Sequence, residues 1–131
     1  GLFVLGDVKV NINCPADLTA YFDSELVSSI IITALVNASR YTKDVVTINA
    51  LTQDDGLLIQ VDDNSQGFPQ SILERFNQEL KPESDQINEQ GLGWLYCNEI
   101  AKSHHNRGRD GFVSLSNESI HKGSRFEVWL P

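Results

Sequence analysis

Basic residues are scarce in this sequence, which has 10 lysines and arginines against 18 aspartates and glutamates. The formal net charge is therefore −8 at pH 7. Because proteins bind nucleic acids and anionic membranes mainly through clustered lysine and arginine, this balance argues against both partners. A single polyphosphate can still bind, since magnesium and backbone N–H groups can supply the positive charge.

Long apolar runs and paired cysteines are also missing. No stretch approaches the roughly 20 apolar residues of a membrane-spanning helix, and no signal peptide is recognisable. Cys14 and Cys97 lie far apart without a C-x-x-C partner, so we predict two free thiols in a reducing cytosol. The domain is therefore expected to be cytoplasmic and not itself embedded in a membrane.

The length of 131 residues fits one domain, 1–131, with a continuous core. The polar and apolar pattern predicts the order strand, helix, strand pair, helix, loop, helix, strand pair. Because strands and helices do not alternate strictly, we expect an α+β fold. It is a two-layer α/β sandwich with one mixed, mostly antiparallel sheet and about three helices on one face. The expected strands are 8–12, 45–50, 57–61, 111–116 and 125–130, and the expected helices are 24–41, 70–76 and 93–103.

One segment, 77–90, reads NQELKPESDQINEQ and is polar, acidic and without periodicity. Long loops of this kind in a compact domain are usually lids or binding elements. We therefore predict a mobile loop at about 77–90.

A polar stripe interrupts the apolar helix 24–41. Asn37 lies four residues after Thr33 and four before Tyr41, so all three share one helix face. A polar side chain on a buried helix needs a partner. Taken alone, Asn37 fits either a ligand contact or an amide bonded to the neighbouring backbone.

A second polar group follows the apolar strand 57–61. Asp63 stands at the strand end, where its carboxylate can accept a hydrogen bond from an exocyclic amine. Gly67 provides the conformational freedom or close approach that a side chain would prevent. Since aspartate, asparagine, serine and glycine are also the usual turn residues, a plain loop explains the group equally well.

The third signal is Gly91-Leu92-Gly93, which leads from the polar loop into a helix. Glycines at a helix N-terminus let phosphate oxygens approach free N–H groups. A lone G-x-G discriminates poorly, and the sequence contains neither a P-loop nor a full G-x-G-x-x-G after a first strand.

The ordered trio is more specific than any one signal. The segment 37–42 (NASRYT) resembles the N box of sensor histidine kinases, while 63–69 (DNSQGFP) and 91–95 (GLGWL) resemble their glycine boxes. The tail 111–131 is similar too. The chain thus resembles the ATP-binding catalytic domain of a histidine kinase, within the ATPase superfamily of gyrase, Hsp90 and MutL. This resemblance implies a Bergerat-type ATP-binding fold with 77–90 as the ATP lid.

The resemblance also implies roles. Asn37 would ligate Mg²⁺, Arg40 would reach the phosphates as a catalytic clamp, and Asp63 would bind the adenine amino group of ATP. Tyr41 would stack on or flank the adenine. The other nucleotide-binding residues would be Gly67, Phe68, Gly91, Leu92, Gly93 and Ser124.

Several residues depart from the family pattern. Thr33 stands where many kinases carry asparagine and the hydrolysing relatives carry the glutamate that activates water. Ser65 and Glu89 replace glycines, and the expected lid contains Lys81 as its one cation. A degenerate nucleotide-binding module that only regulates therefore stays open as an alternative, as does an anti-sigma-type serine kinase.

None of the three histidines has the setting of a phosphoacceptor. His104 and His105 come at a helix C-terminus, where a structural role is expected, and no H-E-x-x-x-P segment accompanies them or His121. The opening residues GLFVLGDV read as an internal boundary of a longer protein. On the resemblance, the phosphorylated histidine lies in an upstream dimerisation domain and a response regulator receives the phosphoryl group. The domain is then either free or the cytosolic part of a membrane-anchored sensor.

Overall fold

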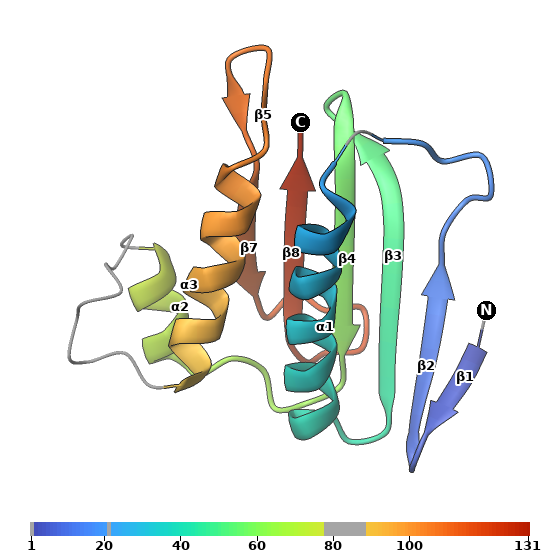
Figure 1. Ribbon diagram of the computed structural model, residues 1–131. Helices are drawn as coiled ribbons and strands as arrows, with labels where there is room; N and C mark the ends of the chain where they lie inside the picture. The colour runs from blue at the N-terminus through green and yellow to red at the C-terminus, as the bar shows by residue number, and fades with distance from the viewer. Residues whose placement is uncertain (1, 21, 78–88) are drawn as a thin grey trace.

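The computed structural model describes residues 2–20, 22–77 and 89–131. Within these ranges a six-stranded sheet forms one layer and three helices cover one of its faces (Figure 1). The expected two-layer α+β sandwich is therefore confirmed. In spatial order the strands are β1 (Leu2–Leu5), β2 (Val8–Asn13), β3 (Val45–Gln53), β4 (Gly56–Asp63), β8 (Arg125–Leu130) and β7 (Phe112–Ser116). The helices are α1 (Ser24–Tyr41), α2 (Gln70–Asn77) and α3 (Glu89–Lys102).

Pairing in the sheet is mixed. β2 and β3 run parallel, and all the other neighbouring strands run antiparallel. The prediction of a mostly antiparallel sheet is thus confirmed. β1 is not among the expected strands. It pairs with β2 through a hairpin at Gly6 and Asp7, where Gly6 has φ +61°.

Helix α1 begins where the sequence predicts. The Asp23 carboxylate caps it by accepting from the backbone N–H groups of Glu25 and Leu26, both at 3.1 Å. The residues that α1 buries recur at helical spacing and face the sheet: Val27, Ile30, Ala34 and Ala38. None of the helices in the described ranges is long and apolar enough to span a membrane.

Two boundaries around α3 differ from expectation. The helix begins at Glu89 rather than near Gly93, because glutamate and glutamine favour helix and extend it toward the N-terminus. Of the predicted lid 77–90, Asn77 ends α2, Glu89 and Gln90 begin α3, and 78–88 lie outside the described residues. After α3 the chain forms an unexpected ribbon of β5 (His105–Asn106) and β6 (Arg109–Asp110).

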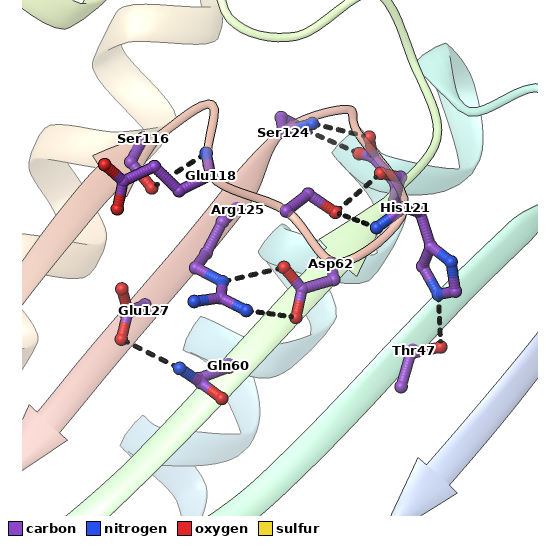
Figure 2. Close-up of polar contacts among 11 residues, drawn as sticks. Thr47, Gln60, Asp62, Ser116, Glu118, His121, Ser124, Arg125 and Glu127 are labelled. Carbon is purple, nitrogen blue, oxygen red and sulfur yellow. Dashed lines mark hydrogen bonds and ion pairs between the residues drawn. The ribbon is translucent and has the colours of Figure 1, made fainter.

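The two faces of the sheet are chemically different. The face under the helices is apolar and forms the core with α1 and α3. On the opposite side, which we call the open face, no helix of the described residues covers the strands (Figure 1). Its centre is polar (Figure 2), with Thr47, Gln60, Asp62, Arg125 and Glu127. Side chains alternate between faces along a strand, so Asp62 lies on the open face and Asp63 under the helices.

Candidate functional site

A pocket of about 340 Å³ lies under α1, at the end of β4 and beside α3. This volume is within the usual range for small-molecule sites. The fold thus brings residues from distant parts of the sequence to one place. Six residues predicted from the sequence line this pocket together: Asn37, Tyr41, Asp63, Gly67, Phe68 and Ser124.

The charged acceptor of the pocket is Asp63, which is only 3% exposed. Its Oδ1 accepts from the backbone N–H groups of Ser65 at 2.9 Å and Ser124 at 3.0 Å. Its Oδ2 accepts from the Ser124 hydroxyl at 2.7 Å. Since a carboxylate has about four acceptor positions, roughly one remains for a donor on a ligand.

The connection between β7 and β8 fixes the position of Asp63. The Ser119 hydroxyl donates to the Asp63 carbonyl at 2.9 Å, and the Asp63 N–H donates to the Ser124 carbonyl at 3.1 Å. Gly123 lies so close that a Cβ there would come within 2.4 Å of the Asp63 carbonyl oxygen. Only glycine permits this approach. Ser119 and Gly123 are absent from the predicted site, because single turn residues give no periodic signal.

Asn37 is half-buried on the pocket side of α1. Its Nδ2 donates to the Thr33 carbonyl at 2.9 Å, which is the backbone contact that the sequence leaves open as an alternative. Among the described residues no donor bonds to its Oδ1. This amide therefore presents an oxygen to a ligand while its nitrogen is held by the helix.

Aromatic rings form the apolar part of the pocket. Trp94 packs edge-to-face on Phe68 at 5.7 Å and lies tilted on Phe126 at 5.0 Å between ring centroids. Tyr41 is 50% exposed and also lines the pocket. The Trp94 Nε1, buried, has no hydrogen-bond partner within the described residues. A flat aromatic ligand would find ring contacts here, which suits a nucleobase.

A second asparagine, Asn64, is not among the residues predicted for the site, and it fixes another wall. Asn64 accepts at its Oδ1 from the backbone N–H groups of Lys43 at 3.0 Å and Asp44 at 3.2 Å, and from the Thr42 hydroxyl at 2.7 Å. These bonds tie the turn after α1 to the end of β4. Lys43 is thereby placed along the pocket lining, next to the Asp63 end.

The predicted phosphate-binding residues come from the end of α1 and the start of α3. Arg40 is exposed in the last turn of α1 and does not line the pocket as described. Gly91, Leu92 and Gly93 lie in the first turns of α3, and Gly93 is also outside that lining. Within the described part of the chain, a Cβ on Gly93 would meet only the Thr33 Cγ2, at an ordinary 3.7 Å. Packing among the described residues therefore does not require glycine at 93, and the roles of these four residues remain predictions.

The thiols behave as the sequence predicts. Both are free, with Cys14 exposed and Cys97 buried. Burial raises the pKa of the Cys97 thiol to about 11, and a hydrogen bond with the Thr33 side chain opposes this rise. Cys97 is thus a protonated core residue at neutral pH, and Thr33 is engaged with it across the α1–α3 contact.

The three histidines have structural partners. His104 accepts at Nε2 from the Asp23 N–H at 3.0 Å, which links the end of α3 to the start of α1. His105 contacts the Asp110 carboxylate within the ribbon. His121 lies 2.8 Å from the Thr47 hydroxyl on the open face, as Figure 2 shows.

The model of one family, described as histidine kinase-, DNA gyrase B- and HSP90-like ATPase, matches residues 22–131. The chain is 34% identical to the sensor histidine kinase TmoS of Ectopseudomonas mendocina over an alignment of 132 positions, which covers 95% of this chain and 13% of TmoS. It is 28% identical to the adaptive-response sensory kinase SasA of Gloeothece citriformis, over 95% of this chain and 32% of SasA. The chain thus spans a third or less of these relatives.

Solved structures share the fold. The ATP-binding domain of PrrB from Mycobacterium tuberculosis superposes with a TM-score of 0.72 at 21% identity, covering 97% of this chain and 82% of that one. Because the identity is low, this similarity establishes the architecture, and the residues of the pocket must carry the functional argument.

Proposed function

Because the chain belongs to the family of histidine kinase-, DNA gyrase B- and HSP90-like ATPases, we propose that it binds Mg–ATP in this pocket. It would act as the catalytic domain of a sensor histidine kinase and transfer the γ-phosphoryl group to a histidine on a separate domain. One observation carries the proposal: the buried Asp63 carboxylate is oriented by neutral donors and keeps an acceptor position for a ligand.

That acceptor position suits adenine. The exocyclic amino group of adenine is an N–H donor, whereas guanine has a carbonyl oxygen at the same ring position. A fixed, buried acceptor discriminates strongly against a ligand that leaves it unpaired. Phe68 and Tyr41 supply ring contacts for the base, while Gly67 and Ser124 line the remaining wall. Asp63 therefore selects ATP.

Asn37 suits magnesium. Mg²⁺ prefers oxygen ligands, and it is usually held by one or two protein groups together with substrate phosphates and water. The Asn37 Oδ1, with the amide nitrogen bonded to Thr33, is such a group. Mg²⁺ bound there would neutralise charge on the phosphates.

The phosphates extend from Asn37 along α1. Arg40 follows Asn37 by three residues, which places both on neighbouring positions of the helix surface. Gly91 is the third residue of α3, within the helix start where backbone N–H groups lack helical partners, and Leu92 and Gly93 follow it. Arg40 and this helix start would hold the polyphosphate by charge and by hydrogen bonds.

The absence of a base at Thr33 directs the chemistry. Threonine does not activate water well, and the Thr33 side chain is hydrogen-bonded with the Cys97 thiol. The γ-phosphoryl group would therefore go to an external acceptor, a histidine on an upstream dimerisation domain, and then to the receiver domain of a response regulator. We place this reaction in the cytosol, where ATP is supplied.

Two measurements test the proposal. Calorimetry should detect Mg–ATP binding to the chain, and an absence of binding would refute it. The full protein should then form phosphohistidine from labelled ATP, and Asn37→Ala should abolish the label while Asn13→Ala keeps it.

Two alternatives have their own outcomes in the second measurement. ATP binding without any label would favour a regulatory module. Phosphoserine on a partner protein would favour an anti-sigma-type kinase. Ser65, the residue that suggests degeneration, is well integrated: its hydroxyl accepts from the Gly67 N–H at 3.1 Å.

A further inference from the structure

We propose that Asn117, which follows β7 directly, is a positioning residue for the nucleotide pocket. Its Oδ1 accepts from the Phe68 N–H at 2.7 Å, and its Nδ2 donates to the Phe68 carbonyl at 3.1 Å. One side-chain amide thus bonds both backbone groups of a pocket residue, as a neighbouring strand would. This inference rests on the proposed binding of Mg–ATP.

Asn117 and Gly67 fit each other sterically. Gly67 has φ +90°, and a Cβ there would lie 2.8 Å from the Asn117 Oδ1 and 2.9 Å from its Cγ. The glycine therefore leaves the space that the amide fills when it reaches Phe68. Substitutions at 67 and 117 should interact energetically, because each residue fixes the position of the other.

The segment that Asn117 holds, Gly67 and Phe68, forms one wall of the pocket. Gly67 and Phe68 line the pocket, and the Phe68 ring packs on Trp94. Ser119 and Ser124, from the same β7–β8 connection as Asn117, hold Asp63. A single connection therefore sets both the hydrogen-bond acceptor for the base and the wall beside it. Without the Asn117 amide this wall would be ordered only when the nucleotide binds. The free energy spent on that ordering would lower the affinity for Mg–ATP.

The test measures Mg–ATP affinity by calorimetry at a temperature where each variant is fully folded by circular dichroism. We expect Asn117→Ala to weaken binding about tenfold, as for the loss of a net hydrogen bond and of pre-organisation. Asn117→Asp keeps the shape and the acceptor for the Phe68 N–H but places an oxygen against the Phe68 carbonyl. This variant should still fold, and it should bind Mg–ATP more weakly than the wild type does.

A control and a double variant separate positioning from general stability. Asn13→Ala removes an exposed amide hydrogen bond, 3.0 Å to Asn49 on the open face, and should leave the affinity unchanged. Gly67→Ala should weaken binding strongly in the wild type and less in the Asn117→Ala background, because the blocking side chain is gone.

The outcomes are distinct. If the wild type binds Mg–ATP and both variants at 117 bind with the same Kd, Asn117 is structural and the inference is wrong. Additive effects at 67 and 117 would also contradict it. If the wild type does not bind Mg–ATP, the proposed function itself fails.

Discussion

Asp62 and Asp63 are consecutive residues at the end of β4, both almost fully buried, yet they lie on opposite faces of the sheet with different partners. On the open face Asp62 accepts from the Arg125 Nε at 2.8 Å, a contact drawn in Figure 2. Under the helices Asp63 is held by serine and backbone donors, all of them neutral.

This difference separates stability from binding. The hydrogen bond to Asp62 raises the pKa of Arg125, which keeps the guanidinium charged beside this carboxylate. A carboxylate paired with arginine has its charge compensated and offers little to a ligand. Neutral donors orient Asp63 while leaving its negative charge and one acceptor position available. Two adjacent aspartates therefore serve the fold and the pocket respectively.

The largest expected effect is on ligand affinity, at Asp63. Asp63→Asn retains Oδ1 for the Ser65 and Ser124 N–H groups but removes the charged acceptor that the base would use. We expect the Kd for Mg–ATP to rise about a hundredfold, as for the loss of a charged hydrogen bond. The free energy of unfolding should fall by only about 1 kcal/mol. Calorimetry and urea denaturation measure the two quantities, and wild-type affinity in this variant would disprove the assignment of Asp63.

At Asp62 the opposite result is expected: a loss of stability without a loss of affinity. Asp62→Asn removes the charged hydrogen-bond partner of the Arg125 guanidinium, whose side chain is only 18% exposed, and leaves it the weaker Coulomb interactions with Glu127 and Glu118. We expect the free energy of unfolding to fall by about 3 kcal/mol, with an unchanged Kd for Mg–ATP in the remaining folded protein.

A matched double variant sharpens this second prediction. Asp62→Leu combined with Arg125→Met replaces the ion pair by apolar side chains of similar size, and stability should return toward the wild-type value. If Asp62→Asn instead lost affinity without losing stability, the division between the two faces would be wrong.

The sequence predicts much of this fold because most elements carry their own periodic signal. The apolar pattern of α1 and its cap at Asp23 define the helix, and the turn residues Asp54 and Asp55 mark the β3–β4 hairpin. The missed strand β1 could have been found from Gly6-Asp7 between apolar runs, which is a hairpin signal. The ribbon β5–β6 is too short to show a period.

The pocket is predictable only in part. Asn37, Asp63 and Gly67 fall in recognisable motifs, and the fold brings them together. Asn64 and Asn117 act on backbone groups that are distant in the sequence, and their partners are set by tertiary packing. An isolated asparagine in a turn looks the same whether it clamps a binding wall or only faces water. Such residues require the structure.

The two tryptophans give the smallest but most direct test of the comparison between faces. Trp94 lines the pocket, whereas Trp129 lies on the open face, stacked on Phe112 at 5.7 Å with its Nε1 donating to the Gln53 carbonyl at 2.8 Å. Mg–ATP should therefore change the fluorescence of Trp94 and leave that of Trp129 unaltered. Trp129→Phe should keep the nucleotide-dependent change and Trp94→Phe should lose it. A change that persists in Trp94→Phe and disappears in Trp129→Phe would place the ligand on the open face, and the pocket under α1 would lose its assignment.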